Sequence, residues 1–207
     1  MPGKRIRVLI VDDSIIFREV LSKGISSDPD IEVAAVAGDP YEAADKIVRY
    51  KPDIMTCDVE MPKMNGIDFI RKLLPQYPMP VIVVSSVSGV VFEAMEAGAV
   101  DFVAKPDIQS AKSVEQFIRE MIEKIKIASV AKVSTVLARK RLQAGVSKIT
   151  LNTDKIIVIG ASTGGTEAIS CILRQLPENV PGIVIVQHIP PVFSRMFAQR
   201  LNDTTKL

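Results

Sequence analysis

The sequence predicts an α/β protein in which a doubly wound, five-stranded parallel sheet is followed by the start of a second parallel α/β unit. Two observations carry this prediction. Short apolar runs alternate with segments of helical spacing through the first 126 residues, and such alternation is typical of a parallel sheet with right-handed crossovers. The same alternation resumes after residue 153. We therefore expect two folded units joined by a linker.

The strands of the first unit are short runs rich in apolar and β-branched residues, as expected where both faces of a sheet are covered. The expected strands are residues 6–11, 31–36, 54–57, 81–84 and 102–104. The first two helices have clear amino ends. Ser14 can cap the first, and Asp39 followed by Pro40 is a cap with proline at the first helical position of the second.

The later helices of this unit are bounded by residues that stop or cap helices. The expected helices are residues 15–25, 41–50, 66–74, 90–97 and 113–126. Pro75 stops the third, and Gly98 closes the fourth. Ser113 with Gln116 forms a capping-box pattern, which predicts that the last helix begins there.

The chain is predicted to divide into a domain over 1–126, a linker over 127–153 and the beginning of a second domain over 154–207. The linker lacks long apolar runs, and residues 130–142 carry a weak amphipathic helical pattern. In the second domain the expected strands are residues 155–159 and 182–187, and the expected helices are residues 167–176 and 193–201.

Composition argues against several classes of function. A net charge of +2 is too small to favour nucleic acid, and no basic recognition helix follows the linker. No apolar stretch approaches the roughly 20 residues that span a bilayer, and no signal-peptide pattern precedes the first strand. Two isolated cysteines, Cys57 and Cys171, do not form a disulfide framework. We expect a cytoplasmic protein with no nucleic-acid partner and no membrane insertion.

Acidic residues and one lysine follow different strands of the first unit. Asp12 and Asp13 follow the first strand, Asp58 the third and Lys105 the fifth. In a sheet of order 2-1-3-4-5 these carboxyl ends converge, and ligands bind there. Clustered carboxylates repel one another without a counter-ion, and magnesium suits a site of few carboxylates and waters.

This arrangement predicts phosphoryl chemistry. An aspartate at such a site can act as a nucleophile and form an acyl phosphate, while Lys105 supplies a mobile positive charge. Ser85, which follows the fourth strand, can donate a hydrogen bond to a phosphate oxygen. The alternative is that each acid merely caps a helix. A full set placed at the ends of different strands rarely arises by accident.

A second motif is the run GASTGG over 160–165, which follows one predicted strand and precedes a helix. The G-x-S-x-G pattern in this context predicts a sharp turn that exposes Ser162 as a nucleophile, with Thr163 next to it as oxyanion donor. The single histidine, His188, ends the next strand. The two strand ends can be neighbours in a parallel sheet, so His188 can serve as the general base.

Two other interpretations of this motif remain open. A glycine loop can bind a dinucleotide, although the glycine spacing here differs and Gln187 and His188 stand where an acidic residue is expected. A histidine at a strand end can also be purely structural. A P-loop is excluded because no lysine precedes Ser162 or Thr163.

The motifs of the first unit resemble the receiver domains of bacterial response regulators over about residues 4–126. The matching motifs are Asp12-Asp13, DVEMPKMNG over 58–66, Ser85 and DFVAKP over 101–106. The resemblance implies a flavodoxin-like fold in which Asp58 accepts phosphate from a histidine kinase. It implies that Asp13, Asp58 and the backbone carbonyl of Glu60 hold Mg²⁺ with the assistance of Asp12.

The same resemblance implies how phosphorylation is sensed. Ser85 and Phe102 would form the switch pair, with Lys105 binding the phosphoryl group, and the bond between Lys105 and Pro106 would be cis. Serine in place of threonine at position 85 is a common variant of the pattern.

The order of receiver, linker, GASTGG and the run QHIP over 187–190 resembles the chemotaxis protein-glutamate methylesterases of the CheB family. This resemblance implies a Rossmann-like hydrolase in which Ser162 and His188 form a triad with an aspartate. That aspartate lies near the end of the family's catalytic domain, and Asp203 is in the wrong place to replace it. We therefore expect this 207-residue chain alone to be inactive.

For the whole protein, the resemblance implies a phosphorylation-activated enzyme that hydrolyses glutamate methyl esters and deamidates glutamines on chemoreceptors. A chemotaxis histidine kinase would be the phosphodonor. The alternative is a phospho-switched receiver that acts only by binding a partner.

Overall fold

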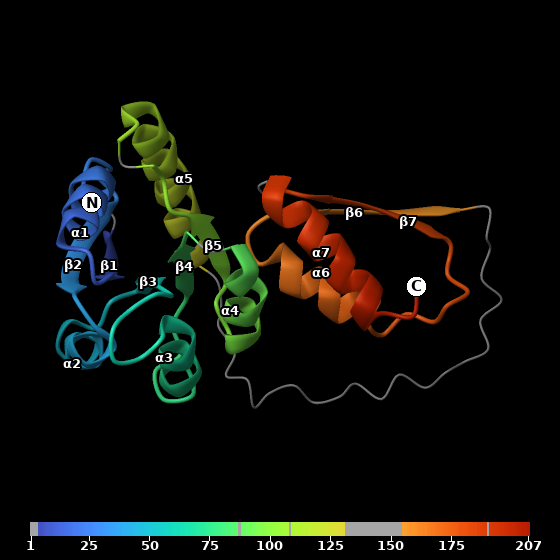
Figure 1. Cartoon of the computed structure of the whole chain (residues 1–207), viewed down its shortest axis with the longest axis horizontal. Coiled ribbons are helices and arrows are strands. Elements are labelled where there is room, and N and C mark those ends of the chain that lie inside the picture. Colours follow the sequence, from blue (N-terminus) through green and yellow to red (C-terminus); the bar gives the residue numbers. More distant parts are fainter. Residues whose placement is uncertain (1–3, 87, 108, 131–154, 190) are drawn as a thin grey trace. The chain divides into compact units, whose positions relative to one another are not determined.

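The computed structural model describes residues 4–86, 88–107, 109–130, 155–189 and 191–207 (Figure 1). The chain divides into two compact units, Met1–Ala138 and Arg139–Leu207. Most of the predicted linker lies outside the described residues. The weak helical pattern over 130–142 does so as well, apart from its first residue. The predicted division at residues 126 and 153 therefore stays a prediction.

The first unit is a five-stranded parallel sheet of order β2-β1-β3-β4-β5, which confirms the predicted fold class and strand order. Its strands are β1 Ile6–Val11, β2 Ile31–Ala37, β3 Ile54–Asp58, β4 Val81–Ser85 and β5 Asp101–Ala104. Asp58 pairs with Val84, and Ser85 with Ala104. This register aligns the carboxyl ends of the central strands at one edge of the sheet.

The helices of the first unit are α1 Ile15–Ile25, α2 Pro40–Tyr50, α3 Gly66–Leu73, α4 Val91–Ala97 and α5 Ala111–Ser129, with a 3-10 turn η1 at Ser88–Val90. The predicted caps at Ser14 and Asp39 are confirmed, because their side chains accept hydrogen bonds from the first-turn amides. Gly98 closes α4 at a φ of 111°, in the left-handed region.

The predicted start of α5 was wrong. Ser110, not Ser113, is the cap: its side chain accepts a hydrogen bond from the Ser113 amide. Ser110 has the extended backbone that a cap requires, so the helix begins before the capping-box pattern. At its other end α5 continues to Ser129, and buried Ala128 joins the core of the unit.

The core on one face of the sheet is formed by α1 and α5. Inward-facing residues of all five strands meet the buried sides of these two helices; the cluster consists of Val8, Ile10, Phe17, Leu21, Ile25, Ile31, Ile54, Ile82, Val84, Val103, Phe117, Met121, Ile125 and Ala128. The rings of Phe17 and Phe117 lie 5.6 Å apart at their centroids. Helices α2, α3 and α4 bury Ala43, Ile47, Ile70 and Ala94 elsewhere in the unit, and the sheet is covered on both faces as predicted.

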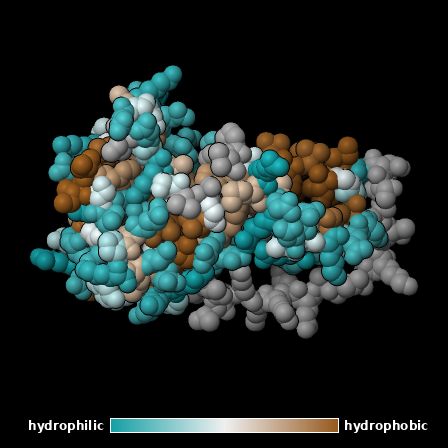
Figure 2. All heavy atoms as spheres, in the orientation of Figure 1, coloured by the Kyte–Doolittle hydropathy of each residue, from teal (hydrophilic) through white to brown (hydrophobic). Residues whose placement is uncertain are grey.

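The second unit has two parallel strands, β6 Ile156–Ala161 and β7 Gly182–Gln187, with α6 Gly165–Leu173 and α7 Pro191–Thr204. The helices bury Ile169, Leu173, Phe193 and Phe197. The other face of the sheet carries Ile156, Val158, Val184 and Val186, each more than half exposed. Figure 2 shows hydrophobic side chains gathered over β6 and β7. This unit therefore has one open apolar face, unlike the covered faces usual for parallel sheets.

None of the helices in the described part of the chain is both long and apolar enough to cross a bilayer.

Candidate functional site

The acidic side chains predicted to converge do so. Asp12 and Asp13 follow β1, Asp58 ends β3, and one carboxylate oxygen from each lies within 4.8 Å of the others. Asp12 and Asp58 are 1% and 2% exposed, whereas Asp13 is open to solvent. Three carboxylates with one on the solvent side form an all-oxygen donor set of the kind that hard divalent cations prefer.

Lys105 lies within this cluster. It follows β5, and its Nζ atom is 2.6 Å from Asp58 Oδ2 and 2.8 Å from Asp12 Oδ2. The contact with Asp58 is a hydrogen bond, but Asp12 Oδ2 is buried and lacks a well-directed donor among the described residues. Phe17 supports the ammonium group from one side, with its ring centroid 4.8 Å from Nζ. The lysine thus serves as the counter-ion of the two buried acids, one of which retains an unused acceptor.

Burial and neighbouring charges have opposing effects on the pKa values of Asp58 and Lys105. Loss of water raises the pKa of Asp58, and the hydrogen bond from Lys105 only partly opposes that effect. Burial by itself would lower the pKa of Lys105, but its contacts with Asp12 and Asp58 outweigh burial and raise that pKa. Lys105 is therefore held as an ammonium, while Asp58 is a carboxyl group whose ionised form would gain from a further cation.

The loop after Asp58 is held close to the site. The Glu60 amide donates to Asp58 Oδ1 at 3.3 Å, and Ser86 Oγ donates to Glu60 Oε2 at 3.1 Å. Gly66 packs directly on the backbone of Asp58: a Cβ atom at position 66 would lie 1.9 Å from the Asp58 carbonyl oxygen. The sequence identified Gly66 as a helix start but not as the residue that lets α3 approach Asp58.

Ser85 and Phe102, the predicted switch pair, end β4 and lie within β5, and each is 4% exposed. Both are therefore inside the protein in this structure. The peptide bond between Lys105 and Pro106 is trans, as are the other peptide bonds among the described residues. The predicted cis bond is wrong here, and the trans form is the one that X–Pro bonds favour by about 0.5–1 kcal/mol.

Sequence reasoning missed three residues near the site. The Arg18 guanidinium donates to the Asp12 carbonyl oxygen. Asp101 and Lys124 form a buried ion pair of 2.8 Å between β5 and α5, and Asp101 also accepts from the Phe102 amide. A signal for Lys124 was available, because it falls at helical spacing among the buried residues of α5.

The two predicted hydrolase residues lie at neighbouring strand ends in the second unit. Ser162 follows β6 and is exposed, and Gly164 continues the turn at a φ of 73° before α6 begins. His188 follows β7, and its amide donates to the Ala161 carbonyl at 3.0 Å. In the described part of the chain no hydrogen bond joins the Ser162 and His188 side chains. Thr163 lies next to Ser162 in the turn, where its amide precedes the first turn of α6.

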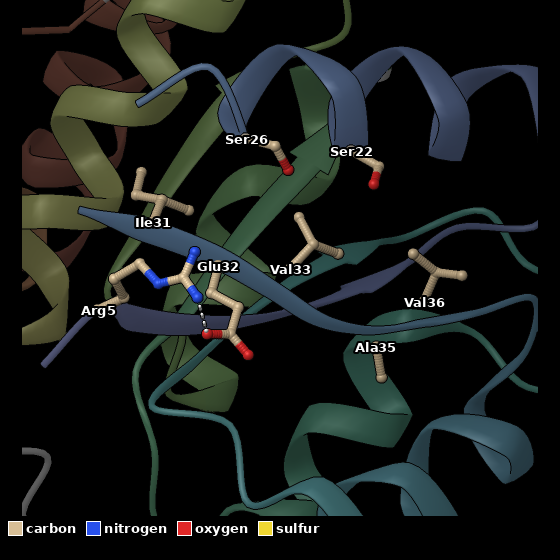
Figure 3. Close-up of a pocket in the computed structure, with 8 residues that line it drawn as sticks. All are labelled: Arg5, Ser22, Ser26, Ile31, Glu32, Val33, Ala35 and Val36. Atoms are coloured by element: carbon tan, nitrogen blue, oxygen red, sulfur yellow. Dashed lines mark ion pairs between the residues drawn. The ribbon is translucent and has the colours of Figure 1, made fainter. Parts of the chain in front are cut away.

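A separate hollow lies along α1 and the edge strand β2, where Ser22 and Ser26 face Val33 and Val36 (Figure 3). Its charged groups are Arg5 and Glu32, which form an exposed ion pair of 3.1 Å. None of the acidic-cluster residues lines this hollow, so it is not part of the candidate site.

Two family models match the chain. The model for the response regulator receiver domain matches residues 8–117, and the model for the CheB methylesterase matches residues 157–207. A protein-glutamate methylesterase/protein-glutamine glutaminase 2 from Syntrophomonas wolfei is 54% identical over 97% of this chain. The chain spans 59% of that relative's length.

Solved structures resemble the first unit. The response regulator domain of Thermotoga maritima CheB has 40% identity and a TM-score of 0.58, covering 62% of this chain and 99% of that one. A structure of the P1 domain of CheA3 in complex with CheY6 from R. sphaeroides matches at 30% identity and a TM-score of 0.52, covering 62% of this chain and all of the matched chain.

Proposed function

The chain belongs to the response regulator receiver family, and on that premise we propose that its first unit is a phosphorylation switch whose acceptor is Asp58. One observation carries the proposal: Lys105 Nζ lies 2.6 Å from Asp58 Oδ2 inside a cluster of three carboxylates. An acceptor for a phosphoryl group needs a carboxylate nucleophile and cationic groups that neutralise the incoming charge. Asp58 and Lys105 supply these two parts.

In the proposed reaction, an oxygen of Asp58 attacks the phosphorus of a phosphohistidine on a chemotaxis histidine kinase. The phosphorus–nitrogen bond breaks, the imidazole leaves, and an acyl phosphate remains on Asp58. Asp13, Asp58 and the Glu60 carbonyl, with Asp12 beside them, would hold Mg²⁺, which supplies charge neutralisation at the phosphoryl oxygens. Lys105 moves its contact from the Asp58 carboxylate to a phosphoryl oxygen. Similarity to CheY6, solved with a CheA3 domain, supports a kinase of this type as partner.

Phosphorylation would then be transmitted by Ser85 and Phe102. The Ser85 hydroxyl donates a hydrogen bond to a phosphoryl oxygen, and the Phe102 ring fills the space that this movement changes. Ser85 ends β4, which pairs with β3, the strand that Asp58 ends. Phe102 lies in β5, the next strand beyond β4. A shift of β4 and β5 alters the surface formed by the helices that follow them.

For the second unit we propose the beginning of a serine hydrolase that this switch activates. Ser162 Oγ attacks the carbonyl carbon of a γ-glutamyl methyl ester on a chemoreceptor, His188 takes the hydroxyl proton, and the Thr163 amide donates to the oxyanion. Methanol leaves with that proton, and water releases the acyl group as glutamate. With glutamine as substrate, ammonia leaves instead. The match over 157–207 and the name of the Syntrophomonas wolfei relative support this assignment.

The phosphorylation proposal is tested by incubating the chain with acetyl phosphate and Mg²⁺ and measuring its intact mass. We expect the mass to increase by one phosphoryl group in the wild-type chain and not in Asp58→Asn. An unchanged mass in a chain shown to be folded would overturn the proposal. The hydrolase proposal is tested separately, by receptor demethylation with a protein of the full length of its relatives and with its Ser162→Ala variant.

A second candidate function is a phospho-switched binding module without hydrolase activity. The observation that favours it is that Asp12, Asp58 and Lys105 all lie in the first unit, so that the phospho-switch does not depend on the hydrolase residues. Hydrolysis of a simple ester by a protein of the full length of its relatives distinguishes the two candidates, because the 207-residue chain alone is expected to be inactive under both. Turnover that disappears in Ser162→Ala favours the hydrolase, and no turnover with normal phosphorylation favours the binding module.

A further inference from the structure

The side chain of Gln187 joins the two strand ends that carry Ser162 and His188. We propose that Gln187 is a positioning residue of the hydrolase, which fixes the serine turn relative to the histidine; this inference rests on the proposed hydrolase function. Gln187 is the last residue of β7, directly before His188. It does not touch the reacting atoms in this proposal but acts on the backbone of both residues.

Its amide group makes two hydrogen bonds that bridge the two turns. Nε2 donates to the Ser162 carbonyl oxygen at 2.9 Å and to the His188 carbonyl oxygen at 3.1 Å. A primary amide has two N–H donors on one nitrogen, so both protons are used. The opposite amide orientation would place Oε1 against two carbonyl oxygens, which cannot donate. The hydrogen bonds therefore determine which end of the amide faces the turns.

The packing around this amide is close. Gln187 Oε1 is buried, and a Cβ atom at position 165 would lie 2.1 Å from it. Gly165 thus provides the space that the amide occupies, which explains why the run GASTGG ends in two consecutive glycines. The Gly165 amide also donates to the Ser162 carbonyl at 2.8 Å. The Ser162 carbonyl is held from two sides, by the helix start and by the end of β7.

This bridge matters for catalysis because it adds a side-chain link to the backbone bond from the His188 amide to the Ala161 carbonyl. Ser162 is exposed on a turn that contains a left-handed glycine. A displacement of about 1 Å between a nucleophile and its base can reduce a rate about 100-fold. A side chain that ties both backbones together limits that displacement without adding a charge.

The test uses a protein that contains this chain and extends over the full length of the matching methylesterases. It compares the Gln187→Met and Gln187→Glu variants of that protein. Methionine has similar length and no donor, whereas glutamate has nearly the same shape, no donor at neutral pH and a negative charge. Matched controls are Gln175→Met and Gln175→Glu, because Gln175 Nε2 also donates to a backbone carbonyl, that of Cys171, at 2.8 Å on the exposed part of the same unit. Demethylation kinetics give kcat and KM, and thermal melting gives the folded fraction.

We expect Gln187→Met to lower kcat about 10- to 100-fold with little change in KM, because positioning affects the reacting atoms more than substrate binding. Gln187→Glu should lower kcat as well, because it lacks both N–H donors and places a negative charge against two carbonyl oxygens. The Gln175 variants should retain wild-type kinetics.

Each outcome separates this inference from the hydrolase proposal. Wild-type kcat in Gln187→Met, together with loss of activity in Ser162→Ala, would overturn the positioning role and leave the hydrolase proposal intact. Full activity in Ser162→Ala would instead overturn the hydrolase proposal itself. A fall in kcat that matches the fall in folded fraction in both Gln187 variants would also count against a positioning role.

Discussion

Removing Lys124 should destabilise the first unit far more than removing a neighbouring lysine of the same helix. Lys124 and Asp101 are both almost fully buried, and their 2.8 Å ion pair joins α5 to β5. In Lys124→Met, the Asp101 carboxylate stays buried but keeps only the Phe102 amide as a hydrogen-bond donor. Its second oxygen, Oδ2, already lacks a partner among the described residues.

The size of the effect follows from this burial. Removing one partner of a buried ion pair costs about 3–5 kcal/mol, because the remaining charge is left without compensation. Since 1.4 kcal/mol is about a factor of ten in an equilibrium constant, the opening equilibrium of α5 and β5 should increase by about two to three and a half orders of magnitude. The control is Lys126→Met, which removes an exposed lysine bound to Asp28 and Asp30 and should change much less.

Amide hydrogen exchange measures this quantity for the first unit alone, even though the chain contains a second unit. Protection of the α5 and β5 amides should fall strongly in Lys124→Met and slightly in Lys126→Met. The double variant Asp101→Asn/Lys124→Met removes both charges and keeps an acceptor for the Phe102 amide, so it should recover most of the protection. Similar losses in Lys124→Met and Lys126→Met, or no recovery in the double variant, would refute this reasoning.

Three further substitutions have expected outcomes. Without metal, Asp58→Asn should be more stable than wild type in urea unfolding, and the difference should shrink as the pH falls. Burial raises the pKa of Asp58, so the wild-type fold becomes less stable as the pH rises through that pKa. Gly66→Ala should lose about 1–3 kcal/mol and phosphorylate about 10- to 100-fold more slowly with acetyl phosphate; in Gly89→Ala, where a Cβ meets nothing within 4 Å, neither quantity should change. Lys51→Gly should gain about 0.5–1 kcal/mol in urea unfolding, because Lys51 ends α2 with a φ of 47°.

Most of the first unit was predictable because its signals are local. Apolar runs of three to six residues mark strands that are covered on both faces, and the caps at Ser14 and Asp39 are formed by residues within three positions of one another. The sheet order came from the resemblance to receiver domains rather than from periodicity. The start of α5 was less predictable, because Ser110 and Ser113 both offer a side-chain oxygen and the backbone of the preceding loop decides between them.

The candidate site was predictable where it depends on strand ends and not where it depends on packing. Asp12, Asp58 and Lys105 each follow a strand, so a parallel sheet must bring them to one edge. Nothing local indicates that Gly66 lies against the Asp58 carbonyl or that the Gln187 amide reaches Ser162, 25 positions earlier in the chain. The first contact depends on how the chain after β3 returns to the end of that strand, and the second depends on the pairing of β6 with β7.

Strand β5 connects the acidic cluster to α5 over a short distance. The strand begins with Asp101, which holds α5 through Lys124, and Lys105 directly after its last residue holds Asp58 and Asp12. The flexible side chain of Lys105 can take up part of its movement toward a new anion, and we expect the remainder to fall on these few residues. A buried ion pair has few alternative geometries, so Asp101 and Lys124 favour movement of β5 and α5 together over distortion within the strand. We therefore expect the charge at Asp58 to affect the position of α5 through β5, and hydrogen exchange of α5 with and without phosphorylation measures that effect.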